Sequence, residues 1–169
     1  MLKIINDLKP FFEDCYGRIN VREYAKIIGV SPPTASKMLE MYNYEKILLK
    51  EPYKNYIFFY ANKESRNFID LSRMYWRYRL NNISSFMEKE LISPTIILFG
   101  SLSKAETKPD SDIDLAVFAH KKELNVSHFE KKLKRKVQIY WFKSVRNIKS
   151  RELANNIING YAISGRLAL

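Results

Sequence analysis

Two pairs of residues in the second half of the chain have the types and spacing needed to act on a phosphate. Gly100-Ser101 follows the apolar run Thr95–Phe99, and Asp112-Ile113-Asp114 precedes the apolar run Leu115–Phe118. A glycine lets the backbone approach a phosphate closely, and a serine adds a hydroxyl and an N–H. Aspartates at i and i+2 of a strand share one face, so both carboxylates can converge on Mg²⁺, which prefers oxygen ligands. The pattern predicts a site for a metal ion together with a phosphate group.

Two buried strands and the polar segment that connects them must position these residues. Thr95–Phe99 and Leu115–Phe118 are short apolar runs, as fully buried strands are. The polar segment 102–111 fits a short helix that ends in a turn containing Pro109. A helix starting near Val126, a strand at Val137–Trp141 and a closing helix from Arg151 to about Asn159 complete a predicted small mixed sheet with helices.

This stretch closely resembles the nucleotidyltransferase superfamily that includes DNA polymerase beta, and especially its minimal branch. The resemblance covers about residues 92–169, and the run Pro109–Leu115 is typical of that branch. It implies that Gly100, Ser101 and Lys104 bind a nucleoside triphosphate, with ATP as the first candidate. It also implies that Asp112 and Asp114 are catalytic and hold Mg²⁺, and that the reaction transfers a nucleotidyl group such as AMP to a protein or nucleic-acid acceptor.

Two positions depart from the pattern that the resemblance implies. At the first, small members of the branch usually carry another glycine where this chain has Ala105, which is a mild change. A third carboxylate is expected on a later strand, where this chain has Gln138. Glutamine can donate a hydrogen bond or offer its carbonyl oxygen to a metal, but it cannot act as a carboxylate base. Two interpretations therefore stay open, an active nucleotidyltransferase and a DNA-binding regulator whose nucleotidyltransferase domain is catalytically degenerate.

Charge favours a polyanionic partner. The chain has 29 Lys and Arg against 18 Asp and Glu, a net charge of +11, and residues after Lys63 carry +8 of it. The basic run Lys131–Lys136 is either a solvated face or a surface for nucleic-acid phosphates. RNA or a ribonucleoprotein bound through the second half is a third interpretation.

The first third of the chain resembles the winged helix-turn-helix domains of prokaryotic regulators. Helices are predicted from Leu2 to about Cys15, from about Val21 to Ile28 and from Pro32 to about Tyr42, with Ser31 as the cap of the third. The β-rich runs Ile47–Leu49 and Tyr56–Tyr60 predict a hairpin. Joined to the second half, this domain resembles proteins of prokaryotic type, with an archaeal source as the expectation that the resemblance implies.

In such domains the third helix enters the DNA major groove and the wing contacts the backbone or minor groove. The residues predicted to contact DNA are Ser31, Thr34, Ser36 and Lys37 on the third helix, and Tyr53, Lys54 and Asn55 at the wing tip. Winged helices also serve as protein-docking or dimerisation modules, so that alternative stays open.

Between the two modules, aromatic and aliphatic residues recur at helical spacing from Glu64 to about Leu91. Aromatics in this pattern are typical of a packed face or a dimer seam rather than of a base-stacking surface. The sequence thus predicts an α+β protein with a winged helix domain at 1–63, a connecting helix at 64–91 and a minimal nucleotidyltransferase domain at 92–169.

Other function classes are excluded by composition. No apolar run approaches the roughly 18 residues that a membrane span needs, and Cys15 is the only cysteine. We therefore expect a soluble, cytoplasmic protein without a disulfide framework or a membrane partner. The family resemblance implies a protein acceptor such as a helical ribonuclease toxin, and a homodimer is a further expected assembly.

Overall fold

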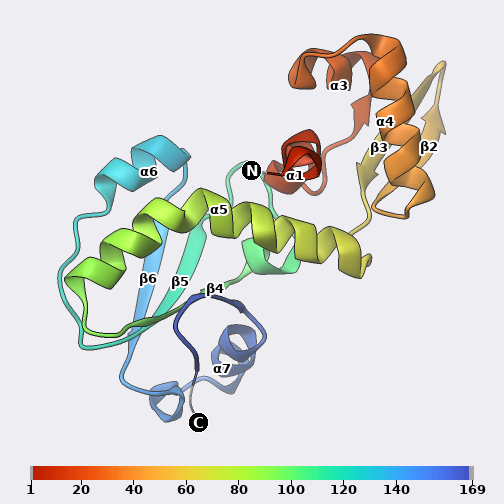
Figure 1. Cartoon of the computed structure of the whole chain (residues 1–169). Coiled ribbons are helices and arrows are strands. Elements are labelled where there is room, and N and C mark those ends of the chain that lie inside the picture. The colour runs from red at the N-terminus through yellow and green to blue at the C-terminus, as the bar shows by residue number, and fades with distance from the viewer. Residues whose placement is uncertain (1, 168–169) are drawn as a thin grey trace. The chain divides into compact units, whose positions relative to one another are not determined.

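The computed structural model describes residues 2–167 and divides into two compact units, each described by itself below. The first unit comprises residues 1–75 with 105–109, and the second comprises 76–104 with 110–169. Helix α5 (Arg66–Glu90) contributes to both units (Figure 1). The protein is α+β, as the sequence predicts, and the predicted long helix after the first third is present.

The first unit begins with two short helices where the sequence predicts one. Helix α1 spans Lys3–Asp7 and α2 spans Lys9–Glu13, so the prediction of a continuous helix from Leu2 to Cys15 is wrong. The break is at Leu8, whose ψ is −1°. Its physical reason is Pro10, which has no N–H to donate to the preceding turn and whose ring crowds that turn.

The next two helices follow their capping residues closely. Helix α3 (Val21–Ile28) starts at Asn20, whose side chain accepts from the backbone while Glu23 accepts in return, and it ends at left-handed Gly29. Helix α4 (Pro32–Tyr44) starts at Ser31, whose Oγ accepts from the Thr34 N–H. The predicted start of α4 is confirmed, and the helix runs two residues further than expected.

A three-stranded antiparallel sheet completes this unit. Strands β2 (Leu48–Tyr53) and β3 (Tyr56–Ala61) form the predicted hairpin, with Lys54 and Asn55 in its turn. The sequence did not reveal β1 (Ile19–Asn20), which pairs with β3, because two residues are too few to show alternation. Strand β2 extends through Pro52 because it lies at the edge of the order β1-β3-β2, where a missing N–H is tolerated.

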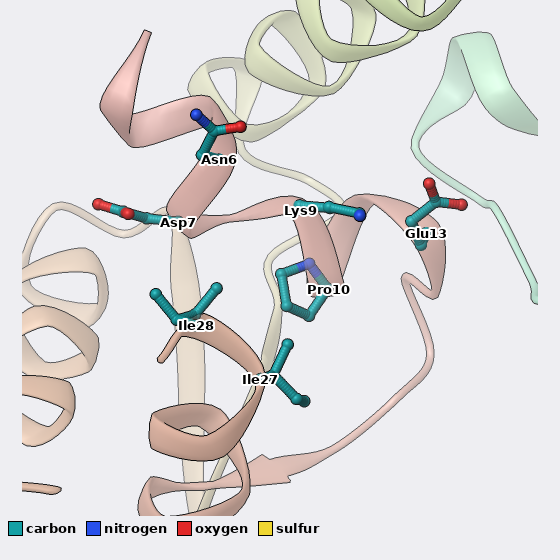
Figure 2. A pocket seen from close by; sticks show the side chains of 7 residues that line it. All are labelled: Asn6, Asp7, Lys9, Pro10, Glu13, Ile27 and Ile28. Carbon is teal, nitrogen blue, oxygen red and sulfur yellow. The ribbon is translucent and has the colours of Figure 1, made fainter. Parts of the chain in front are cut away.

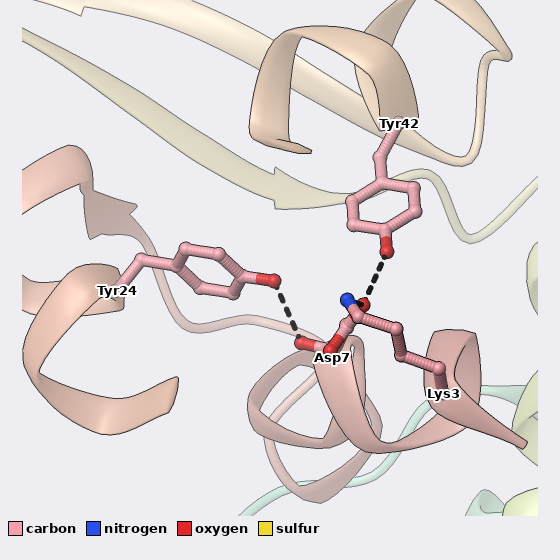
Figure 3. A network of polar contacts seen from close by, with 4 residues as sticks. All are labelled: Lys3, Asp7, Tyr24 and Tyr42. Atoms are coloured by element: carbon pink, nitrogen blue, oxygen red, sulfur yellow. Dashed lines mark hydrogen bonds and ion pairs between the residues drawn. The ribbon is translucent and has the colours of Figure 1, made fainter. Parts of the chain in front are cut away.

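A buried carboxylate connects the helices of the first unit (Figure 3). Asp7, at the end of α1, is 6% exposed, and its Oδ2 accepts from the Tyr42 hydroxyl at 2.9 Å and from Lys3 Nζ at 2.6 Å. The Tyr24 hydroxyl donates to the Asp7 backbone carbonyl at 3.0 Å. Burial, with Asp7 beside both rings, raises the pKa of each tyrosine, so both hydroxyls remain donors at physiological pH.

The second unit is built on a four-stranded mixed sheet of order β6-β5-β4-β7. Its strands are β4 (Thr95–Phe99), β5 (Ile113–Phe118), β6 (Val137–Phe142) and β7 (Tyr161–Ser164). Strands β5 and β6 are parallel, and the other pairs are antiparallel. Helices η1 (Ser101–Lys104), α6 (Ser127–Leu133), η2 (Val145–Asn147) and α7 (Arg151–Ile158) connect them.

Both faces of this sheet are covered. On one face, Ile97, Phe99 and Ala116 pack with Ile157 of α7 and with Ile148. The alternate residues of β4 and β5 are also fully buried, namely Ile96, Leu98, Leu115 and Val117. Because both faces of the two central strands are buried, their sequences are nearly continuous apolar runs, and the prediction that these strands are fully buried is confirmed.

The short helix predicted in the segment 102–111 is present as the single turn η1, which starts one residue earlier, at Ser101. The inward face of α5 differs from the sequence-based expectation. On α5, Tyr78 is 58% exposed although the spacing predicts it as inward, and Trp76 is fully buried in its place. The polar Arg73, Arg77 and Arg79 around these aromatics left the helix phase ambiguous on sequence alone.

The basic run is not uniformly solvated. Helix α6 ends at Leu133, and Lys134 takes the left-handed conformation that stops it. Arg135 is 8% exposed, lies over the Trp76 ring at 5.2 Å and donates to the Ser111 carbonyl at 2.7 Å. The interpretation of the whole run as a solvated or phosphate-binding face is thus wrong for Arg135, which fixes the backbone just before Asp112. Across residues 2–167, no helix has the length and apolar character to span a membrane.

The buried carboxylate gives a stability prediction for the first unit. Replacing Tyr42 by Phe leaves Asp7 Oδ2 without one of its donors, and we expect a loss of about 1–3 kcal/mol in the free energy of unfolding. Tyr44→Phe is the matched control because Tyr44 is 81% exposed, and its effect should stay within about 0.5 kcal/mol. Urea unfolding measures both, and equal effects of the two variants would contradict the role assigned to Asp7.

Candidate functional site

The Gly-Ser turn and the second aspartate are in direct contact. Gly100 ends β4 with a φ of +71°, and its neighbour Phe99 pairs with Asp114 across the β4–β5 ladder. A Cβ on Gly100 would lie 2.3 Å from Asp114 Oδ2, a distance that real Cβ atoms do not show. Only glycine therefore allows both this backbone conformation and this approach of the carboxylate.

The turn that follows is short and internally bonded. Ser101 begins η1, and the Ser103 hydroxyl donates to the Gly100 carbonyl at 3.0 Å. Lys104, at the end of η1, is exposed and donates to Asn156 Oδ1 of α7 at 2.7 Å. The three residues predicted to bind a nucleotide thus follow one strand end, and Gly100 among them lies against Asp114.

The two carboxylates share this end of the sheet. Asp112 immediately precedes β5, and Asp114 is its second residue. Burial of Asp114, together with the negative charge of Asp112, raises the pKa of the Asp114 carboxyl. Two anions held close together at a half-buried position favour the binding of a cation, because the cation removes their repulsion.

The neighbouring strand brings Gln138 to the same place. Strand β6 runs parallel to β5 with Gln138 in register with Asp114, and the Gln138 amide nitrogen donates to Asp112 Oδ2 at 2.7 Å. The Tyr140 hydroxyl donates to the Gln138 carbonyl oxygen at 2.9 Å. Burial and the charges of Asp114 and Asp112 raise the pKa of Tyr140, which keeps its hydroxyl protonated.

Sequence reasoning missed two residues of this arrangement. Tyr140 could have been found, because it lies two residues after Gln138 and therefore on the same face of the strand. Asn156 could not, because only the tertiary packing of α7 brings it to Lys104.

The donor set at this site fits a magnesium ion. Asp112 and Asp114 offer carboxylate oxygens, and Mg²⁺ usually binds proteins through one or two carboxylates and completes its shell with waters and substrate phosphates. Among residues 2–167, no group of three or more His, Cys, Asp and Glu side chains is arranged to hold a metal. The site therefore suits a cation that arrives with a phosphate ligand rather than one enclosed by protein.

The residues predicted to contact DNA lie on α4 and at the β2–β3 turn of the first unit. Thr34 and Lys37 are exposed, Ser36 is partly exposed, and the Ser31 and Thr34 hydroxyls are 2.9 Å apart at the start of α4. At the turn, the ammonium of Lys54 lies 5.5 Å from the centre of the Tyr53 ring.

Two cavities lie away from all these residues. One, of about 440 Å³ in the first unit, is lined by residues of α1, α2 and the end of α3 (Figure 2). The other, of about 600 Å³ in the second unit, lies beside Ile139 and Trp141 of β6 and the exposed Lys121 and Lys122. None of the predicted site residues lines either cavity.

The contact between Gly100 and Asp114 can be tested by a double-mutant cycle. Gly100→Ala should destabilise the protein by about 1–3 kcal/mol for its positive φ, and further because the new methyl group meets the carboxylate. Adding Asp114→Ala to this variant should remove the destabilisation that comes from the methyl group meeting the carboxylate. Urea unfolding should therefore give a coupling free energy of at least about 1 kcal/mol between the two substitutions.

Gly29→Ala is the control for backbone strain alone. Gly29 has a φ of +75°, and a Cβ there would meet no atom within 4 Å. The loss of unfolding free energy that Gly29→Ala causes should be the same with or without Asp114→Ala. Additive effects of Gly100→Ala and Asp114→Ala would contradict the close approach described here.

Comparison with known proteins agrees with this geometry. Residues 81–164 match the family described as "Polymerase beta, Nucleotidyltransferase", a range that runs from the second half of α5 through β7. Gly100, Ser101, Asp112, Asp114 and Gln138 all lie inside it. No curated protein and no solved structure matches the chain. The second part of this chain, residues 81–164, is thus similar to the nucleotidyltransferase family over just under half of the chain.

Proposed function

We propose that this domain binds a magnesium-bound nucleoside triphosphate, ATP first, and transfers its nucleotidyl group to an acceptor hydroxyl. The acceptor oxygen bonds to the α-phosphorus, the bond to the β-phosphate breaks, pyrophosphate leaves, and the hydroxyl proton passes to the acceptor itself or to a partner. The observation that supports the proposal best is the contact of Gly100 with Asp114. Because of this contact, the turn that can approach phosphates and the carboxylates that can hold the metal lie in one site. Two separate surface features would have no reason to meet at van der Waals distance.

Each residue has a distinct task in this proposal. The backbone at Gly100 and the hydroxyl and N–H of Ser101 donate to the triphosphate, and the exposed Lys104 adds a positive charge beside it. Asp112 and Asp114 hold Mg²⁺, which supplies charge neutralisation at the reacting phosphate when it is bound. The protein's main work is then to position the nucleotide for attack by the acceptor.

The acceptor must contribute to its own activation. Gln138 stands next to both carboxylates and cannot remove a proton from an attacking hydroxyl. The two aspartates are engaged with the cation in this proposal, so the acceptor itself or a partner protein supplies the remaining assistance. A hydroxyl of a partner protein is our preferred acceptor, and a nucleic-acid hydroxyl is the alternative.

The first test is nucleotide binding, which needs no knowledge of the acceptor. ATP with Mg²⁺ at about 100 times its Kd should stabilise the protein by about 2.7 kcal/mol, seen as a rise in melting temperature. The double variant Asp112→Asn/Asp114→Asn removes both charges with little change of shape and should abolish this rise.

Two controls make the result specific. ATP with EDTA should produce little stabilisation of the wild type, because the carboxylates then repel the triphosphate. Asp110→Asn is the matched variant, since Asp110 is exposed and lies in the same loop, and it should behave as the wild type does. If the wild type gains no stability from Mg–ATP, the proposed function is wrong for ATP.

A second candidate function is DNA binding by the first unit as a winged helix. It is favoured by the capped helix α4 beside a β-hairpin, with Lys37 and Lys54 exposed on these two elements. In this proposal α4 enters the major groove while the hairpin turn contacts the backbone. The two candidate functions are compatible, because they use different units of the chain.

The salt dependence of DNA affinity tests this second function. Loss of each phosphate contact lowers the slope of log K against log salt by about 0.9, so Lys37→Ala/Lys54→Ala should lower it by nearly 2. Lys9→Ala on α2 is the control, since α2 carries none of the residues predicted to contact DNA. Fluorescence anisotropy with a labelled duplex measures both, and an unchanged slope in the double variant would contradict this docking mode.

A further inference from the structure

The amide of Gln138 is held at both ends inside the carboxylate site. Its nitrogen donates to Asp112 Oδ2 at 2.7 Å, and its oxygen accepts from the Tyr140 hydroxyl at 2.9 Å. The Tyr140 ring is itself fixed by an edge-on contact with Phe99 of β4, with 5.2 Å between ring centres. The side chain of Gln138 is therefore oriented although its position on the edge strand leaves it exposed.

Chemistry determines which end of this amide faces the aspartate. An ionised carboxylate only accepts hydrogen bonds, so the NH₂ group must lie toward Asp112 and the carbonyl must lie away from it. The reverse orientation would bring two oxygens together. The carbonyl, which is the only atom of Gln138 able to bind a metal, is thus turned toward Tyr140 and away from the carboxylates.

The charge of the site leads to the same conclusion. Asp112 and Asp114 together carry at most two negative charges, which one divalent cation neutralises. Within residues 2–167, no third His, Cys, Asp or Glu completes a metal-holding group with them. A second divalent cation would have phosphate oxygens of the nucleotide as ligands, but beside Asp112 it would find no further protein carboxylate and would meet the N–H donors of Gln138 instead.

We propose that Gln138, by standing where a carboxylate would bind a metal, limits this site to one divalent cation per bound nucleotide, and that Tyr140 holds its amide with the N–H donors toward Asp112. The inference rests on the proposed function, since the cation enters with the nucleotide. It makes Gln138 a residue that determines cation stoichiometry, and it predicts that a carboxylate at this position creates a second cation site.

The test counts cations directly and does not depend on turnover. Equilibrium dialysis with Mn²⁺ and the analogue α,β-methylene-ATP, with equal free analogue on both sides, gives the number of Mn²⁺ ions per protein. We expect one for the wild type, one for Gln138→Leu and two for Gln138→Glu. The leucine variant is the matched control because it removes the amide without adding charge.

A thermal readout supports the count. Without divalent cations, Gln138→Glu should melt below the wild type. In the wild type the Gln138 amide donates a hydrogen bond to Asp112, whereas in the variant a carboxylate at that position repels Asp112. Mn²⁺ with the analogue should raise its melting temperature by more than it raises that of the wild type. Gln138→Leu should show the wild-type rise.

The outcomes separate failure of this inference from failure of the proposed function. Two Mn²⁺ ions on the wild type, or a single ion on Gln138→Glu while the wild type also holds one, would overturn the role of Gln138 and leave nucleotide binding intact. No Mn²⁺ on either protein in the presence of the analogue would overturn the proposed function itself, and the inference with it.

Discussion

The close approach of Gly100 to the Asp114 carboxylate is the constraint on which the site depends. Strands β4 and β5 pair so that Phe99 lies opposite Asp114, and the chain must leave β4 at that level through a left-handed residue. Any side chain at position 100 would push the carboxylate away from the turn. Two features therefore bring the phosphate-binding backbone close to the metal-binding carboxylate. They are the antiparallel register of β4 and β5 and the absence of a Cβ at Gly100.

The first aspartate is positioned by a different interaction. Arg135 is buried against Trp76 of α5 and donates to the Ser111 carbonyl, one residue before Asp112. A buried guanidinium is tolerated only where aromatic faces and carbonyl oxygens replace its water, and this one has both. The packed helix α5 therefore contributes to the site through Trp76 without placing a side chain in it.

In the first unit, a comparable role belongs to Asp7. Its carboxylate and its backbone carbonyl together accept from Tyr42 of α4, Tyr24 of α3 and Lys3 of α1. A buried acceptor with several donors fixes the relative placement of helices more specifically than apolar contacts do, because each hydrogen bond has its own direction. The placement of α4, which carries Thr34, Ser36 and Lys37 of the residues proposed to contact DNA, follows from this arrangement.

The sequence by itself determined what is local or periodic. The strand at Thr95–Phe99, the strand predicted at Val137–Trp141, the cap at Ser31, and the Gly-Ser and Asp-x-Asp pairs all follow from short patterns of residue type. The break at Leu8 also had a local cause, Pro10, although the apolar spacing concealed it.

Tertiary structure decided the features that depend on distant partners. Arg135 belongs to a run of six residues, five of them basic, and only the position of Trp76 makes it a buried structural residue. The inward face of α5 passes through Trp76 rather than Tyr78, which aromatic spacing could not distinguish. The orientation of Gln138 likewise needs Asp112 and Tyr140, which the parallel pairing of β5 and β6 brings together. Periodicity reports which residues share a face, whereas the partner of a polar group is set by pairing between segments far apart in the chain.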